Sequence, residues 1–300
     1  MNGAGAAVLV HLASGIGNIV MATPLLMALA DAGFSVDVRL DADYAQTIEL
    51  FHGWSVIRRI AAAAFPAAPA TYAHVLPAVP PFYWFRFAGL YRGRTAASRP
   101  PDSLFQADEQ AWYIAFARAL GCGGETREYR LPVGPSERFG VSGATVVLAP
   151  GCKTGEMASK RWPWFAKLAQ RFDDVAVVGT RDDVEDGSFP SHCRWFVDRL
   201  SLRETAELLA SGGLVVANDS GLAHVAAAVG TPTLMLFGPT SDTVLGRLPK
   251  HVKVLRSGLD CEPCWTTARL ASCERRVDCL RQLSVDRVEA EVRRMRGTPE

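Results

Sequence analysis

Twice along this chain, a short apolar run rich in β-branched residues ends in a glycine turn that leads into a helical pattern. The first run is AAVLVHL at residues 6–12, followed by SGIGN and then by IVMATPLLMALADAG. The second is TVVLAPG at residues 145–151, followed by RWPWFAKLAQRF at residues 161–172. Strands that alternate with helices predict parallel sheets, because parallel strands need crossover connections.

The rest of the chain continues the alternation in both halves. Further strands are predicted at residues 34–40 and 71–77, then at 174–180, 213–219 and 231–237. Helices are predicted at residues 103–121, 201–211, 221–230 and 284–297. The Pro-, Gly- and Ser-rich stretch at 131–144 separates the halves. We therefore predict an α/β protein with two Rossmann-like domains, residues 1–138 and 139–300.

Size and composition agree with two packed domains. The chain has 300 residues, more than one hydrophobic core usually holds, and is 49% apolar and 21% charged. Lys and Arg total 32 against 31 Asp and Glu, so no basic field favours nucleic acid as a partner. The N-terminus lacks the pattern of a signal peptide, and no run of eighteen apolar residues occurs, which predicts a cytoplasmic protein.

The ends of two predicted strands carry the residues best suited to a ligand, in NDSGLAH and GPT. Ligands of open parallel sheets bind beyond the carboxyl ends of the strands. A helix N-terminus offers N–H groups and a positive dipole to phosphate, so a diphosphate fits after Asp219 and Ser220. His224, one turn later, can donate to a phosphate oxygen. The alternative is that these residues only cap a helix around a buried histidine.

The segment NDSGLAHVAAAVGTPTLMLFGPT resembles the one typical of glycosyltransferase family 9, the ADP-heptose:lipopolysaccharide heptosyltransferases and their relatives. PGCKTGEMASKRWPWFAKLA resembles that family's second-domain opening, where a Lys before Arg-Trp-Pro contacts the donor phosphates; here it is Lys160. SGIGNIVMATPLL resembles its N-terminal glycine loop, and DEQAWYIAFARALG its first-domain closing helix. The Cys-Glu-Pro-Cys at 261–264 also recurs in the family.

The resemblance implies a GT-B fold, in which two Rossmann-like domains with parallel sheets face a central cleft. It also implies an inverting glycosyltransferase that moves a heptose-like sugar from a nucleotide-diphosphate donor such as ADP-heptose, without a divalent metal. The acceptor would be a glycan, protein or small-molecule hydroxyl in bacterial biosynthesis, held by the first domain. The expected donor-binding residues are Gly15, Gly17, Lys160, Asn218, Asp219, Ser220, Gly221, His224, Gly238, Pro239 and Thr240. Lys160 and Asp219 are also expected to serve catalysis, where a cation stabilises the departing diphosphate.

The first domain departs from the family at the position of the presumed catalytic base. The family carries Asp directly after the glycine turn, whereas this chain has Asn18, whose amide cannot take a proton. Asn18 can still position the acceptor. The base is then sought near other strand ends, among His11, Asp41, Asp43 and His74, and the sequence does not choose between them.

Two other functions compete with the transferase. The departure at Asn18 suggests a non-catalytic nucleotide-sugar-binding protein of the same fold. The glycine turn also resembles a dinucleotide-binding fingerprint, but Val20 replaces its third glycine. An oxidoreductase would also leave the segments around Lys160 and Asp219 unexplained.

Four of the seven cysteines crowd into residues 261–279, as Cys261, Cys264, Cys273 and Cys279. Four thiolates can enclose a structural Zn or Fe ion, which we favour over disulfides or merely reduced thiols. The isolated Cys122, Cys152 and Cys193 are expected to be small buried side chains.

An aromatic and basic stretch, PPFYWFRFAGLYRGR, lies in the first half at residues 80–94. It suits an acceptor loop or a patch that makes peripheral contact with a membrane. A core helix with solvated arginines is an equal alternative.

Overall fold

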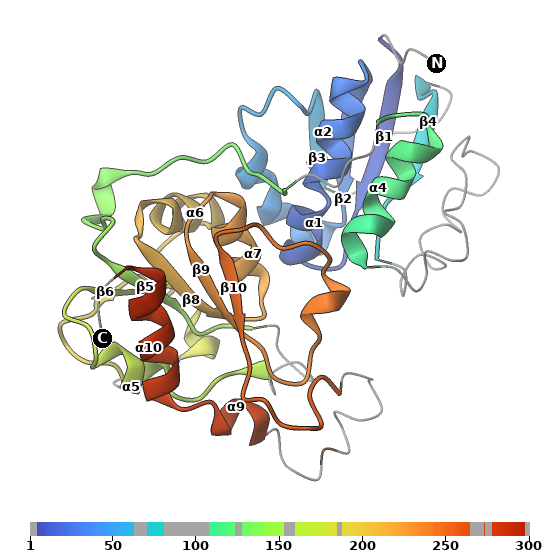
Figure 1. Ribbon diagram of the computed structural model, residues 1–300. Helices are drawn as coiled ribbons and strands as arrows, with labels where there is room; N and C mark the ends of the chain where they lie inside the picture. The colour runs from blue at the N-terminus through green and yellow to red at the C-terminus, as the bar shows by residue number, and fades with distance from the viewer. Residues whose placement is uncertain are drawn as a thin grey trace. The chain divides into compact units, whose positions relative to one another are not determined.

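The computed structural model describes residues 5–62, 71–80, 108–123, 128–152, 160–184, 188–264, 273 and 278–297 (Figure 1). The chain divides into two compact units. Unit 1 comprises Met1–Pro132 and Thr243–Leu248, and unit 2 comprises Val133–Asp242 and Pro249–Glu300. The short return to unit 1 is held by Gln110, whose Nε2 donates to the carbonyl of Arg247 at 2.9 Å.

Among its described residues, the sheet of unit 1 has four parallel strands in the order β3-β2-β1-β4. They are β1 (Ala7–Leu12), β2 (Ser35–Leu40), β3 (Arg59–Ala62) and β4 (His74–Pro77). β1 and β2 are in register from end to end, with Leu12 opposite Leu40. The residues that follow these two strands therefore leave the same edge of the sheet as neighbours.

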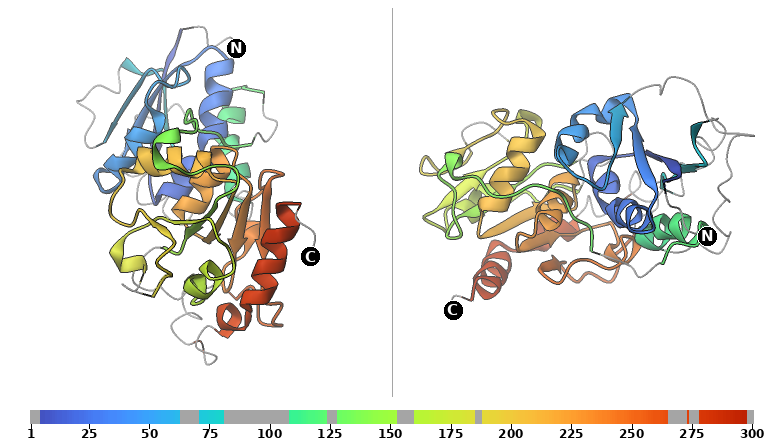
Figure 2. Two further views of the ribbon diagram at one scale, coloured as in Figure 1. Left: turned by 90° about the vertical axis from the view of Figure 1, so that its left-hand side faces the viewer. Right: turned by 90° about the horizontal axis from the view of Figure 1, so that it is seen from above.

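The helices of unit 1 are α1 (Ile16–Met21), α2 (Thr23–Asp31), α4 (Glu109–Ala119) and the 3-10 helix η1 (Ala42–Phe51). The single helix predicted over residues 19–33 is wrong, because it is interrupted at Ala22. Pro24 lies in the first turn of α2, where a missing N–H does least harm, so the proline starts a new helix. α2 and α4 lie side by side (Figure 2). Leu25 and Leu29 of α2 and Trp112 of α4 are buried.

In the part of unit 2 that the structure describes, the sheet has six parallel strands in the order β10-β9-β8-β5-β6-β7. They are β5 (Val146–Ala149), β6 (Val175–Val177), β7 (Arg194–Trp195), β8 (Leu214–Asn218), β9 (Thr233–Leu236) and β10 (Val252–Leu255). The helices are α5 (Phe165–Ala169), α6 (Leu202–Ser211), α7 (Gly221–Ala228), α9 (Asp278–Gln282) and α10 (Val285–Met295). Short 3-10 helices are η5 (Glu137–Phe139), η7 (Arg181–Asp183) and η8 (Asp242–Val244), the last crossing into unit 1.

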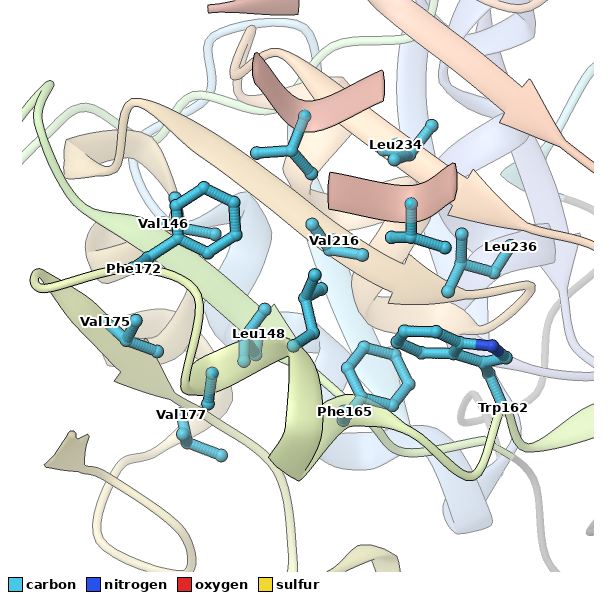
Figure 3. Packing of buried hydrophobic residues seen from close by; sticks show 14 of the residues in the cluster. Val146, Leu148, Trp162, Phe165, Phe172, Val175, Val177, Val216, Leu234 and Leu236 are labelled. Carbon is cyan, nitrogen blue, oxygen red and sulfur yellow. The ribbon is translucent and has the colours of Figure 1, made fainter. Parts of the chain in front are cut away.

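One face of the second sheet carries the main core of unit 2 (Figure 3). Alternate residues of neighbouring strands point to this face, among them Leu148, Val216 and Leu236, and they pack against helices α5, α9 and α10. Trp162 and Phe165 lie edge to face, with ring centroids 5.1 Å apart. The other face is covered by α7, which packs against α6, β8 and β9.

The predicted strands and helices of unit 2 are found, with some differences, and the short helix α9 was not predicted. The helix predicted over residues 161–172 is only α5, five residues long. Strands β7 and β10 were missed because each is short and partly exposed, so neither shows a long apolar run. Strand β3 of unit 1 was missed for a similar reason, since Arg58 and Arg59 interrupt its apolar pattern.

Candidate functional site

The carboxyl edge of the second sheet has its switch point between β5 and β8, where the strand order runs outward in both directions. Ala149, the last residue of β5, pairs with Ala217 of β8. The segments after these strands therefore leave the sheet together. Open parallel sheets bind ligands in the crevice at this point. The predicted residues 218–221 thus lie where the fold itself favours a ligand.

Asn218 joins three segments at this point. Its side chain is fully buried, its Oδ1 accepts from the backbone N–H of Trp162 at 2.9 Å, and its Nδ2 donates to the carbonyl of Pro150 at 2.5 Å. Both polar atoms of the amide are thus used inside the protein. Asn218 shapes the site by holding the chain before α5 and the turn after β5 against the end of β8.

Lys160 and Asp219 form an ion pair beside Asn218. The Nζ of Lys160 lies 2.8 Å from the Oδ2 of Asp219, and the side chains are only 14% and 11% exposed. Thr240 Oγ1 donates to the same carboxylate oxygen at 2.8 Å. Three residues that the sequence placed in three separate motifs are therefore in direct contact. Asp219 fixes the positions of the ammonium group and of the loop after β9.

The charges at this point are set by burial and by the neighbouring donors. Burial alone would raise the pKa of Asp219, but the Lys160 ammonium and the Lys160 and Thr240 hydrogen bonds hold that pKa below its ordinary value. His224 is 3% exposed, and burial lowers its pKa to about 4, although the Asp219 charge acts in the opposite direction. At neutral pH, Asp219 is therefore a carboxylate and His224 an uncharged imidazole.

The N-terminus of α7 begins directly after this ion pair. Ser220 is its N-cap residue, and the hydroxyl makes no capping hydrogen bond. By contrast, Ser201 caps α6 by accepting from the N–H of Glu204 at 3.2 Å. The first N–H groups of α7, starting at Gly221, therefore have no side-chain cap and carry the positive end of the helix dipole. This arrangement suits an anionic oxygen.

The loop after β9 completes the site. The carbonyl of Gly238 accepts from Nη1 of Arg256 at 3.1 Å, and the carbonyl of Pro239 accepts from the N–H of Cys264 at 2.9 Å. Thr240 then reaches Asp219 as described above. Hydrogen bonds from Arg256 and Cys264, and one to Asp219, thus hold the three predicted residues of this loop, Gly238, Pro239 and Thr240.

In unit 1, the turn after β1 has a strained backbone. Ser14 and Gly15 have positive φ values of 77° and 129°, the second typical of glycine. Asn18 lies in the first turn of α1, and its Nδ2 donates to the carbonyl of Ser14 at 3.0 Å. Gly17 is the second residue of the same helix. Asn18 therefore holds the turn closed with its amide.

The four candidate bases lie in different places. His11 Nε2 lies 2.9 Å from Asp41 Oδ1 at the carboxyl edge of the first sheet. Asp43 is exposed two residues further on. His74 is the first residue of β4 and pairs with Val8, so it lies toward the amino end of the strands, contrary to the expectation from sequence. The structure brings together only His11 and Asp41.

The four cysteines of the 261–279 segment differ in exposure. Cys261 is exposed, Cys264 and Cys273 are partly exposed, and Cys279 is buried in the main core of unit 2. Burial, with the charge of Glu262, raises the pKa of Cys279 to about 12, so its thiol is protonated. Among the described residues, no three His, Cys, Asp or Glu side chains form a group that could hold a metal ion. As predicted, Cys122 and Cys152 are buried, whereas Cys193 is partly exposed.

The aromatic and basic residues 81–94 lie outside the described residues, so their predicted role as an acceptor loop or membrane patch is not addressed by the structure. Within the described part of the chain, no helix has the length and apolar character to cross a membrane.

Two residues that support the site escaped notice in the sequence. Trp162 gives its backbone N–H to Asn218 and its indole N–H to the carbonyl of Leu283 at 2.8 Å. Arg256 holds Gly238 and also donates to Asp242 at 2.7 Å. Their partners lie 14 to 121 positions away in the sequence, so no local pattern could have identified these contacts.

Comparison with known proteins finds a match to one family in the second half of the chain. Residues 135–273 match the model of glycosyltransferase family 9 (heptosyltransferase). Lipooligosaccharide heptosyltransferase 2 of Haemophilus influenzae is 36% identical over 122 residues, which cover 36% of this chain and 35% of that protein. The matched stretch thus spans about a third of the relative's length. The resemblance inferred from the motifs is confirmed.

Solved structures extend the likeness to both units. The Escherichia coli ADP-heptose lipopolysaccharide heptosyltransferase II structure covers 97% of this chain and 98% of its own, with a TM-score of 0.71 and 21% identity. The iron-containing dodecameric glycosyltransferase TibC of enterotoxigenic E. coli covers 98% of this chain and 77% of its own, with a TM-score of 0.68 and 15% identity. At these identities the likeness establishes the fold. The predicted GT-B fold with two parallel-sheet α/β units is confirmed.

Proposed function

We propose that this chain, whose second unit carries a glycosyltransferase family 9 sequence, is an inverting glycosyltransferase that uses a nucleotide-diphosphate sugar. The donor would be ADP-heptose or a close analogue, since the relatives with the matching segment are heptosyltransferases. The acceptor would be a hydroxyl of a glycan, protein or small molecule, bound by unit 1, in a cytoplasmic reaction.

One observation carries the proposal: the Lys160–Asp219 ion pair lies at the switch point of the second sheet, next to an N-terminus of α7 that has no side-chain cap. The ammonium group and the helix N–H groups together offer hydrogen-bond donors to an anionic oxygen, with Asp219 balancing the charge of Lys160. A diphosphate gains charge when its bond to the sugar breaks, so donors fixed at that place stabilise the leaving group more than the intact donor. Stabilisation of a leaving diphosphate is the chemistry that glycosyl transfer needs.

Each residue of the site then has a stated part. Lys160 and the first N–H groups of α7 would bind the diphosphate oxygens, and the uncharged His224 would donate one hydrogen bond without adding charge. Asp219 would keep the Lys160 ammonium in position, with Thr240 as its second donor. Asn218, Gly238 and Pro239 would hold the backbone around the site, while Gly15, Gly17 and Asn18 would shape the edge of unit 1.

The test is turnover with a defined donor. Purified protein is incubated with ADP-heptose and other nucleotide sugars, together with bacterial glycolipid, peptide and small-alcohol acceptors, and nucleoside diphosphate release is measured. We expect release that depends on one donor and on an acceptor. If nucleotide sugars raise the melting temperature but none releases its nucleoside diphosphate, the chain is the non-catalytic binding protein and the enzyme proposal fails.

We further propose that Cys261, Cys264, Cys273 and Cys279 hold a structural Zn or Fe ion apart from the transfer chemistry. Four thiol ligands are a donor set that suits either metal. The charges of Cys261 and Cys264 contribute to the raised pKa of Cys279, although no three of the described His, Cys, Asp or Glu side chains form a group that could hold a metal ion. Elemental analysis of protein purified without chelator should find about one Zn or Fe per chain. Its absence would reject this part of the proposal.

A further inference from the structure

A histidine and an aspartate form a pair at the carboxyl edge of the first sheet. His11 is the fifth residue of β1, Asp41 directly follows β2, and the His11 Nε2 and Asp41 Oδ1 atoms are 2.9 Å apart. The side chain of His11 is 0% exposed, whereas that of Asp41 is 27% exposed. His11 is therefore the buried residue of the pair, and Asp41 is the one that reaches the surface.

The register of the strands places Asp41 beside the glycine turn of unit 1. Leu12 and Leu40 are paired at the ends of β1 and β2, so Ala13 and Asp41 are the first residues past neighbouring strand ends. The turn that starts at Ala13 contains the two positive-φ residues Ser14 and Gly15. Backbone strain of this kind is found most often at functional sites. Asp41 therefore borders the segment in which the family carries its presumed base.

Asn18 does not fill the role of the base. Its amide has no proton-accepting nitrogen, and its Nδ2 is committed to the carbonyl of Ser14 at 3.0 Å. His74 lies toward the amino end of the strands, away from this edge. Asp41 is a carboxylate at the end of the neighbouring strand, directly opposite the start of the turn in register.

The two members of the pair can be assigned different parts. His11 is fully buried, so it cannot touch an acceptor. Burial lowers its pKa despite the opposing effect of Asp41, so at neutral pH it is uncharged and its Nε2–H donates to Asp41 Oδ1. The Asp41 side chain makes no capping hydrogen bond to η1, and it is 27% exposed. A partly exposed carboxylate whose other oxygen is held by a buried histidine suits a general base.

We propose that Asp41 is the general base of the transfer and that His11 is its positioning residue, an inference that rests on the proposed function. Asp41 Oδ2 takes the proton of the acceptor hydroxyl as the acceptor oxygen forms its bond to the anomeric carbon. The bond between that carbon and the diphosphate oxygen breaks, and its electron pair leaves with the nucleoside diphosphate. The proton then passes from Asp41 to water.

The test compares Asp41→Asn with Asp43→Asn in the full chain, using ADP-heptose and the acceptor that gives the fastest release with the wild type. General-base catalysis contributes about 10²- to 10⁴-fold, so Asp41→Asn should lower kcat by at least about 100-fold, while Asp43→Asn should change it less than about twofold. The Kd for ADP should stay the same in both, because neither residue lies in unit 2. Loss of activity in Asp43→Asn alone would overturn the proposal.

His11 is tested by two substitutions. His11→Gln can keep an N–H near Asp41, whereas His11→Leu removes it, so kcat should fall about tenfold or more in the Leu variant and recover in the Gln variant, with KM for the donor unchanged. A merely structural role would instead lower the melting temperature of both variants without this difference in kcat, and would overturn the assignment of His11.

The failure of this inference can be told apart from failure of the proposed function. If the wild type releases ADP and Asp41→Asn does so at the same rate, the chain is a transferase with another base. If the wild type releases no nucleoside diphosphate with any donor and acceptor, there is no transfer for Asp41 to serve, and both proposals are rejected.

Discussion

At the scale of single residues, Asp219 determines the chemistry of the second unit. A carboxylate that is nearly buried costs free energy unless it is paired, and here it is balanced by the Lys160 ammonium and the Thr240 hydroxyl. The pair carries no net charge, but it holds the Lys160 ammonium at the switch point, where the two side chains are only 14% and 11% exposed. A charge of this kind acts more strongly on an incoming phosphate than one on the open surface.

Removing the Lys160 charge should weaken nucleotide binding. A hydrogen bond to a charged group contributes about 1.5–3 kcal/mol, so Lys160→Met should raise the Kd for ADP about 10- to 100-fold. Calorimetric titration measures this, and Lys167→Met is the matched control, because the Lys167 ammonium lies over the Trp164 ring at 4.3 Å. The double variant Lys160→Met with Asp219→Asn removes the carboxylate that the single change leaves unpaired. Its affinity for ADP should still be lower than that of the wild type. Equal ADP affinity in wild type and Lys160→Met would remove Lys160 from the site.

His224 should make the stability of unit 2 depend on pH. Its folded pKa of about 4 is below the ordinary value of 6.5, so between these values the unfolded chain binds more protons. Its contribution to stability is therefore complete above pH 6.5 and is lost as the pH falls toward 4. Between pH 7 and pH 5, the loss should be about 2 kcal/mol.

The His224→Gln variant has no proton to gain in this range. Urea unfolding of unit 2, followed by hydrogen exchange at pH 7 and pH 5, should show a shallower loss of stability in the variant than in the wild type. Parallel pH dependences for the two proteins would show that His224 is not the buried, uncharged group described here. His11, whose pKa is also lowered by burial, contributes in the same direction to unit 1.

At the scale of elements, the site depends on how closely the connections of unit 2 approach the sheet. Gly213 lies between α6 and β8, and its N–H donates to the carbonyl of Thr145 at 3.0 Å. A Cβ added at Gly213 would come within 1.9 Å of the carbonyl oxygen of Gly143, which is backbone and cannot move aside alone. The start of β8, and with it the position of Asn218 at its end, needs a glycine here.

Gly213→Ala should therefore destabilise unit 2 by about 1–3 kcal/mol, the usual effect of overpacking, or by more if β8 shifts. Gly143→Ala is the matched control, because a Cβ at Gly143 would meet nothing within 4 Å. Denaturant unfolding of the two variants and the wild type gives the comparison. Equal stability of the two variants would mean that the segments before β5 and β8 are not packed as described.

At the scale of the whole molecule, the two units have separate sheets and separate cores. The candidate diphosphate site is built from residues of unit 2 alone, whereas the His11–Asp41 pair belongs to unit 1. Binding of a nucleoside diphosphate and binding of an acceptor should therefore be separable by mutation. This division is what allows ADP affinity to serve as the control for substitutions in unit 1.

Hydrogen exchange with and without ADP should locate nucleotide binding in unit 2. The backbone N–H groups at the start of α7, from Gly221 onward, should exchange more slowly with ADP bound, because phosphate oxygens would accept from them. Peptides that cover residues 160–162 should also exchange more slowly, because Lys160 would bind the phosphate. Slowed exchange confined to unit 1 would place the nucleotide elsewhere and contradict the assignment of the site.

Local sequence was sufficient to predict most elements and the positions of most candidate residues. The apolar periodicity predicted the parallel sheets, and the turn residues after β8 and β9 were identified as ligand-facing because parallel strands end at one edge. The break in the first helix at Ala22 and the short strands β3, β7 and β10 were not predicted. Their propensities are weak, and neighbouring strands or packing decide whether such segments form.

The partnerships within the sites were decided only by the tertiary structure. Lys160 and Asp219 are 59 positions apart, and His11 and Asp41 are 30 apart, so neither contact leaves a local pattern. The order and register of the strands brought Asp41, and not Asp43 or His74, to the histidine of β1. The sequence by itself determined which residues could do the chemistry; strand order and burial decided which of them meet and what charge each one holds.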